Sequence, residues 1–109
     1  MEEKRKLPRI EVNWPVEAFL DDRIIEGTVK NITLKGLFVC FEAPLTLKEK
    51  FRLSVFPSDD KVINIVGKIV WSNSYAIAEE NVPVCIGLSF VKISTEDINS
   101  LKEILHDYM

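Results

Sequence analysis

Two short stretches of the sequence carry side chains that could bind an anion. The first is Arg5-Lys6-Leu7-Pro8-Arg9, in which two arginines stand four positions apart. Pro8 disfavours a helix and biases Leu7 toward extended geometry. In an extended chain the two guanidinium groups point to the same side, about 13 Å apart at roughly 3.3 Å per residue. Arginine pairs with phosphate or with the O6/N7 edge of guanine, so this stretch could bind an anion. Taken by itself, however, it is interpreted as a solvated basic tail.

The second stretch is Asn31-Ile32-Thr33-Leu34-Lys35-Gly36, which lies where one expected strand turns into the next. Asn31 and Thr33 are two positions apart and present an amide and a hydroxyl to one face of a strand. Gly36 is the residue expected where φ must be positive or where a ligand approaches the backbone closely. A hairpin turn that needs no ligand is the competing interpretation.

The charge distribution favours the N-terminal arm as the place for an anion. The 109 residues hold 14 Lys and Arg against 17 Asp and Glu, a net charge of −3. Residues 1–9 carry a net charge of +2 and residues 10–109 a net charge of −5. The length fits one domain. Since residues 1–9 are charged and no apolar run is long enough to span a membrane, we expect a cytoplasmic protein.

The sequence does not predict an enzyme, a metal site or a cofactor. His106 is the only histidine and falls on the polar side of the expected helix, and the four glycines form no phosphate-binding loop. The pairs Asp59-Asp60 and Glu79-Glu80 are interpreted as turn formers and solvated charge. Cys40 and Cys85 are expected to be reduced, buried and unpaired, although a disulfide is the alternative.

Period-two alternation predicts about six short strands with turn residues between them. A break at Gly67 is interpreted as a bulge, and residues 37–41 are apolar on both faces, which predicts a strand buried on both sides. After Ser94 the spacing of Ile98, Leu101, Leu105 and Tyr108 predicts a helix over about residues 94–108, with a capping box at its start. The expected strands cover residues 12–20, 24–32, 37–41, 51–55, 63–71 and 84–90.

These elements define a mainly β fold, a small antiparallel barrel with one C-terminal helix. We divide the chain into a basic arm, residues 1–11, and a single barrel domain, residues 12–109. Trp71, Phe38 and Phe90 could serve as stacking platforms, but they are interpreted mostly as core packing because they alternate along the expected strands.

The two stretches together, followed by Val70-Trp71 and by Gly87-Leu88-Ser89-Phe90, resemble the PilZ family over nearly the whole chain. Arg5 and Arg9 match the first motif of that family, R-x-x-x-R. Asn31, Thr33 and Gly36 match the second, [D/N]-x-[S/T]-x-x-G. The resemblance implies a six-stranded antiparallel β-barrel and binding of the bacterial second messenger cyclic di-GMP.

With this ligand, Arg5 and Arg9 would contact phosphate and guanine, Asn31 and Thr33 would read a guanine edge or a phosphate, and Gly36 would let the loop backbone come close. Lys4 is an additional phosphate ligand or a solvated residue. Thr33 stands where the family commonly has Ser, and Asn31 has one acceptor oxygen where Asp has a carboxylate.

We expect a cyclic di-GMP receptor or adaptor that regulates motility, biofilm or exopolysaccharide functions through rearrangement of the arm. The alternative is a PilZ-like module that binds a protein partner and no nucleotide. A barrel that binds single-stranded nucleic acid is disfavoured by the net charge of −5 in residues 10–109. The sequence does not identify the downstream partner, the ligand stoichiometry or the choice between monomer and homodimer.

Overall fold

The computed structural model describes residues 9–20, 23–41, 50–72 and 84–108. Six strands and one helix lie in these ranges, and the sequence order is all strands first and the helix last. Their bounds are β1 Ile10–Phe19, β2 Ile24–Ile32, β3 Gly36–Phe41, β4 Lys50–Ser58, β5 Lys61–Ser72, β6 Val84–Ile93 and α1 Thr95–His106.

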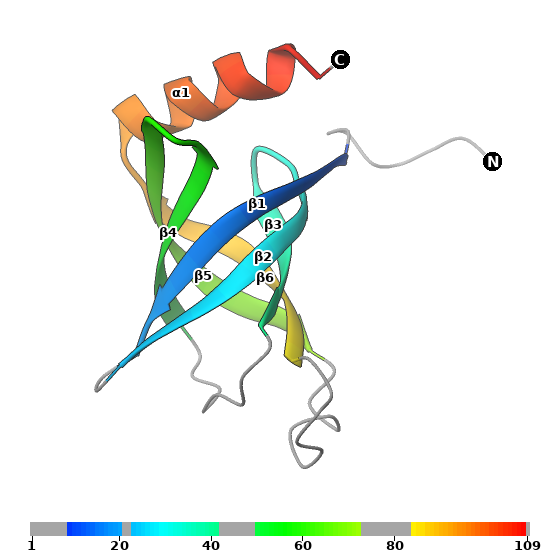
Figure 1. Ribbon diagram of the computed structural model, residues 1–109, viewed down its shortest axis with the longest axis vertical. Helices are drawn as coiled ribbons and strands as arrows, with labels where there is room; N and C mark the ends of the chain where they lie inside the picture. Colours follow the sequence, from blue (N-terminus) through cyan, green and yellow to red (C-terminus); the bar gives the residue numbers. More distant parts are fainter. Residues whose placement is uncertain (1–8, 21–22, 42–49, 73–83, 109) are drawn as a thin grey trace, which may run out of the picture.

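The strands form a closed antiparallel barrel in the order β1-β2-β3-β6-β5-β4 (Figure 1). The strands β3 and β6 are far apart in sequence but pair directly, from Gly36 opposite Ser89 to Phe41 opposite Val84. Because the sheet closes on itself, none of its six described strands is left as an unpaired sheet edge that could pair with another chain and aggregate. The expected fold class, a six-stranded antiparallel barrel with one C-terminal helix, is therefore confirmed.

The barrel interior is filled by branched aliphatic side chains from alternate positions of every strand. Val29, Val39, Phe41, Val55 and Ile86 have no accessible surface. Such alternation of inward apolar and outward polar residues is the pattern that a closed sheet requires. The predicted period-two pattern therefore assigned most of the core correctly.

The helix α1 lies across one end of the barrel (Figure 1). Leu101 and Leu105 are its buried residues, and Ser94 caps its first turn by accepting a hydrogen bond from the Asp97 backbone N–H at 3.0 Å. The Asp97 carboxylate accepts from the Asn64 N–H of β5 at 3.1 Å, so this carboxylate ties the helix to the barrel. The expected helix start is confirmed.

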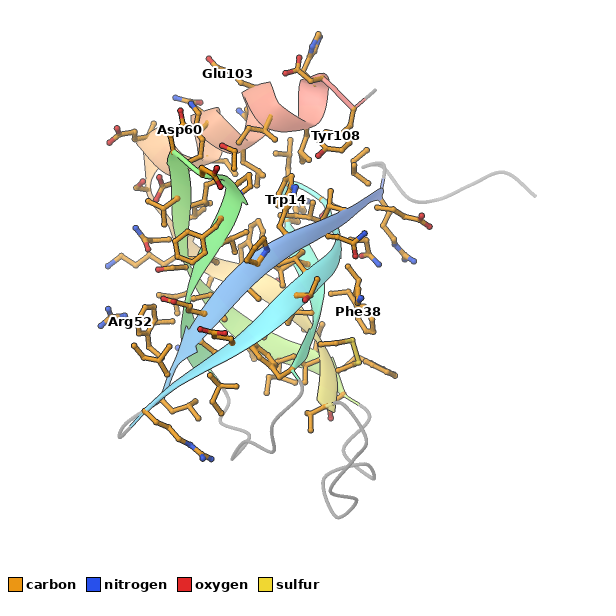
Figure 2. The ribbon with its side chains drawn as sticks, in the orientation of Figure 1. Trp14, Phe38, Arg52, Asp60, Glu103 and Tyr108 are labelled. Atoms are coloured by element: carbon orange, nitrogen blue, oxygen red, sulfur yellow. A yellow bond between two sulfur atoms is a disulfide. The ribbon has the colours of Figure 1, made fainter. Side chains whose placement is uncertain are left out.

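Tyr108 lies beyond the last helical residue and is half exposed, although the spacing predicted it on the buried face. Its ring packs edge-on against Trp14 of β1, with 6.1 Å between ring centroids. Figure 2 shows the pair beneath the helix, at the end of the barrel that the helix covers.

The predicted turns near residues 33–36 and 57–60 are confirmed with small shifts, and those near residues 21–22 and 44 lie outside the described residues. The strand β4 runs through Pro57 and Ser58, so the turn between β4 and β5 is reduced to Asp59-Asp60. An irregularity does lie beside Gly67, but the extra residue is Val91 of β6. Ile10 and Glu11, which we assigned to the arm, are the first residues of β1. Residues 72–81, where we expected a long loop, lie outside the described residues except for Ser72, which still belongs to β5.

The expectation of two reduced, buried cysteines is wrong. Cys40 of β3 and Cys85 of β6 form a disulfide, and both residues are half-buried on the outer face of the barrel. The two residues are direct cross-strand partners with 4.0 Å between their Cα atoms. Their 45-residue separation in sequence concealed this proximity because only the β3–β6 pairing brings them together.

Candidate functional site

The candidate site lies on the outer face of the barrel, along a row of cross-strand partners. Glu11 of β1 pairs with Asn31 of β2, and Asn31 pairs with Phe38 of β3. Phe38 pairs with Gly87 of β6, which pairs with Trp71 of β5. The row therefore brings residues from five strands side by side, although they are spread over positions 11 to 87 of the sequence.

Four of the residues predicted for the site line one open hollow of about 360 Å³ on this face. Arg9 comes from the entry to β1, Asn31 from β2, and Thr33 and Gly36 from the turn between β2 and β3. We call this the first hollow. Arg5 and Lys4 lie outside the described residues. The remaining lining residues are Leu37, Phe38, Val70, Gly87 and Leu88.

Hydrogen bonds fix the turn that separates β2 from β3. The Thr33 hydroxyl accepts from the backbone N–H groups of Lys35, at 3.0 Å, and Gly36, at 3.1 Å. The Thr33 N–H donates to the Gly36 carbonyl at 2.8 Å, and the Phe90 N–H of β6 donates to the Lys35 carbonyl at 2.8 Å. The Thr33 hydroxyl thus stabilises the turn, and a backbone hydrogen bond connects the turn to β6.

Gly36 is required because two strands approach each other closely at this position, and not because the backbone adopts a special conformation. Within the described residues no glycine has a positive φ, so one of the two reasons we gave for a glycine here is wrong. A Cβ at this position would collide with the backbone carbonyl oxygen of Leu88 on β6. The missing side chain therefore lets β3 approach β6 beside the turn.

Trp71 lies on the outer face and is 53% exposed, so its interpretation as core packing is wrong. Its ring contacts that of Phe38, with 5.6 Å between centroids and 45° between the ring planes. The physical reason is an irregularity in the β5–β6 pairing: Ile69 is opposite Leu88 and Trp71 is opposite Gly87, which leaves Val70 as an extra residue. A bulge of this kind changes which face the following side chain occupies.

Phe38 and Cys40 likewise correct the expectation of a strand buried on both sides. Both are half-buried on the outer face, whereas Leu37, Val39 and Phe41 fill the interior. Phe90 is also half-buried.

Gly87 leaves the strand backbone without a side chain between the two aromatic residues. It lies between Phe38 and Trp71 in the row, and a Cβ placed on it would be in ordinary contact with Trp71 Cβ, at 3.6 Å. Cross-strand aromatic contact over a glycine is a known way to cover exposed strand backbone. The first hollow therefore has five lining residues that were not predicted for the site, Leu37, Phe38, Val70, Gly87 and Leu88. Val70, Gly87 and Leu88 lie in segments that resemble later family strands, and Phe38 was considered as a stacking platform but interpreted mostly as core packing.

A second hollow of about 450 Å³ adjoins the first and shares Asn31 and Phe38 with it. Its other walls are Glu11, Val12 and Asn13 of β1 and Lys30 of β2. Together the two hollows occupy the outer face of β1, β2, β3, β6 and β5. Their volumes fall within the roughly 300–1,000 Å³ typical of small-molecule sites.

No catalytic or metal-binding constellation is found in the part of the chain that the structure describes. Its His, Cys, Asp and Glu residues form no group of three that could hold a metal ion. His106 is exposed near the end of α1, as the helical spacing indicated. None of the described helical residues forms a helix long and apolar enough to cross a membrane.

The fold is similar to that of solved PilZ structures. The PilZ domain of YcgR from Escherichia coli with c-di-GMP aligns with a TM-score of 0.75 at 15% identity, covering 97% of this chain and 92% of that chain. The Bacillus subtilis inhibitor of motility (MotI/DgrA) aligns with a TM-score of 0.73 at 16% identity, covering 94% and 49%.

YcgR from Escherichia coli in complex with c-di-GMP aligns with a TM-score of 0.73 at 15% identity, covering 96% and 46%. This chain thus spans less than half the length of the last two proteins. No curated protein matches the sequence significantly.

The family model for the PilZ domain matches residues 3–107. That range contains both motifs, all six strands and the helix. The chain therefore belongs to the PilZ domain family.

Proposed function

We propose that this protein is a receptor for cyclic di-GMP, which binds on the outer face of the barrel over the first hollow. The observation that carries the proposal is the meeting of Arg9, Asn31, Thr33 and Gly36 around one hollow. These residues come from two separate segments, and they are the described members of two motifs separated by about twenty residues.

Arg9 supplies positive charge at the rim of the first hollow. It is exposed, and no hydrogen bond or ion pair within the described residues engages its side chain. A guanidinium group with unused donors can pair bidentately with a phosphate or with guanine O6 and N7.

The contact between Phe38 and Trp71 supplies an apolar surface next to that charge. Val70, which is 66% exposed, extends this surface along β5. A purine can stack on exposed aromatic rings, and each stacked base contributes roughly 1–3 kcal/mol to binding. Charge on one side and aromatic surface on the other suit a ligand built from phosphates and purines.

Thr33 and Gly36 act mainly by holding the shape of the turn. Because the Thr33 hydroxyl already accepts two backbone N–H groups, its contribution to the ligand is positional, and Asn31 is the polar side chain with a free amide at this edge. The family's common Ser at this position could make the same turn hydrogen bonds, so Thr33 is compatible with the proposed role.

The N-terminal residues 1–9, which precede β1, would close over the ligand through Arg5 and Arg9, with Lys4 as a further cation. Binding would then change the surface that a downstream protein contacts, in motility, biofilm or exopolysaccharide control. The chain would act as a non-catalytic adaptor in the bacterial cytoplasm, without a cofactor.

The test is thermal unfolding with saturating cyclic di-GMP, beside GMP and cyclic di-AMP as controls. Ligand at one hundred times its Kd stabilises the folded state by about 2.7 kcal/mol, which corresponds to roughly 10 °C for a domain of this size. An unchanged midpoint with cyclic di-GMP would leave the protein-interaction module as the function.

Arg9→Ala tests the arm directly, with Arg52→Ala as its matched control. Arg52 is an exposed arginine of β4 whose guanidinium lies over the Phe19 ring, on the opposite side of the barrel from Phe38 (Figure 2). We expect Arg9→Ala to weaken binding at least tenfold in calorimetric titration, and Arg52→Ala to leave binding unchanged. Equal affinities for both variants would remove Arg9 from the site.

A further inference from the structure

We propose that the second hollow is a guanine-recognition subsite, in which Glu11 and Lys30 read one base of the ligand. The inference rests on the proposed function, because it assigns a base of cyclic di-GMP to a place beside the first hollow. Glu11 and Lys30 belong to neither sequence motif.

Position is the first argument. Glu11 is the direct cross-strand partner of Asn31, and both line the second hollow with Lys30 and Phe38. Asn31 and Phe38 also line the first hollow. A ligand with two linked purines, anchored in the first hollow, therefore has a continuous path into the second.

The backbone provides a second argument, since it turns Lys30 and Asn31 to the same side. Val29 is opposite Val39 and Asn31 is opposite Phe38, so β2 contains one residue more than β3 at this point. Val29 and Ile32 both point into the core, with Lys30 and Asn31 between them. Bulges are frequent beside binding sites because they redirect side chains in this way.

The chemistry of the walls matches guanine. The base presents two acceptors, O6 and N7, and donors at N1 and N2. Glu11 is an acceptor-only carboxylate and Lys30 is a donor-only ammonium group. Among the described residues, no hydrogen bond or ion pair engages either side chain. Phe38 adds a ring on which the base can stack.

Glu11 also supplies acceptor oxygens that the second motif lacks in this chain. Asn31 is neutral and offers one acceptor oxygen, so by itself it satisfies few guanine donors. The carboxylate that an Asp would bring at position 31 is supplied from the neighbouring strand by Glu11, its cross-strand partner. Adenine presents an acceptor at N1 and would face the carboxylate unfavourably, which gives the subsite its preference.

The test compares cyclic di-GMP with cyclic di-IMP, whose hypoxanthine base lacks the 2-amino donor, by calorimetric titration of the full chain. We expect the wild-type protein to prefer cyclic di-GMP by tenfold or more, and Glu11→Gln to bind it about tenfold more weakly and to lose the preference. Lys30→Gln should weaken both ligands by the same factor, because both retain O6 and N7. Glu26→Gln, an exposed carboxylate farther along β2 that lines neither hollow, should change nothing.

The outcomes separate the two proposals. If wild-type protein binds cyclic di-GMP and Glu11→Gln retains both affinity and preference, the subsite is refuted and the receptor proposal survives. If wild-type protein binds neither ligand, both are refuted. Glu11 is exposed, so Glu11→Gln should unfold at the wild-type midpoint without ligand, and thermal unfolding verifies that any loss of affinity arises in the site.

Discussion

The same substitution, glycine to alanine, should have opposite effects at two positions of the candidate site. At Gly36 the added Cβ would collide with the backbone carbonyl of Leu88, which cannot move without disturbing the β3–β6 ladder. At Gly87 the added Cβ would meet Trp71 Cβ at 3.6 Å and Val70 Cγ2 at 3.9 Å, which are ordinary contacts. The two residues lie on adjacent strands of one face, so the comparison isolates the local approach of the backbone.

The magnitudes follow from these contacts. Overpacking typically costs about 1–3 kcal/mol, whereas replacing glycine at a compatible position stabilises by roughly 0.4–1 kcal/mol through the unfolded chain. At about 4 °C per kcal/mol for a domain of this size, Gly36→Ala should lower the melting temperature by roughly 4–12 °C. Gly87→Ala should raise it by roughly 2–4 °C.

Thermal unfolding by circular dichroism measures both shifts, and titration with cyclic di-GMP adds a functional readout. Because the Gly87 methyl would enter the first hollow, Gly87→Ala should weaken ligand binding while the fold gains stability. Equal melting temperatures for the two variants would refute the close approach at Gly36. Stabilisation with unchanged affinity would show that the ligand does not use this part of the hollow.

Three further changes test the fold around the site. Thr33→Val removes the acceptor of two backbone N–H groups and should lower the free energy of unfolding, measured with denaturant, by about 1–2 kcal/mol. Thr33→Ser should stay within about 0.5 kcal/mol of wild type. Equal losses for the two variants would contradict the role of the Thr33 hydroxyl in the turn. Leu101→Ala, at a side chain with no accessible surface, should cost about 2–5 kcal/mol, and a smaller loss would show that α1 docks loosely. Reduction of the Cys40–Cys85 disulfide should cost about 2–4 kcal/mol, and a double Cys→Ala variant that is insensitive to reductant provides the control.

Much of the fold could be predicted from sequence because the barrel obeys local rules. The alternation of Val16, Ala18 and similar positions identified the strands, and the spacing of Leu101 and Leu105 identified the helix face. Ser94 marked the helix start because its hydroxyl was suited to cap the first turn. These features depend on neighbours within one turn or one strand.

Two of the errors share a different origin, since each depends on a pairing between distant strands. Cys40 and Cys85 were expected to be unpaired because nothing local indicates that β3 lies beside β6. Gly36 was expected where φ is positive, but its φ is not positive, and its close neighbour is the Leu88 carbonyl of that same distant strand. Four of the nine residues that line the first hollow could be predicted from the two motifs. The contributions of Phe38 and Gly87 could not be predicted, because they arise only from the register of the strand pairing.

Two bulges explain why a period-two analysis missed the rest of the site. In β2 the extra residue turns Lys30 and Asn31 outward together, and in β5 the extra residue Val70 turns Trp71 outward. Strict alternation would place one residue of each pair inside the barrel, which is how Trp71 was misassigned. A bulge leaves in the sequence only two neighbouring residues of similar character, and ordinary strands contain such pairs as well. The bulged strands β2 and β5 flank β3 and β6, so the surface between them gains side chains that a regular barrel would bury. The binding face of this barrel is therefore built where its strands depart from regular pairing.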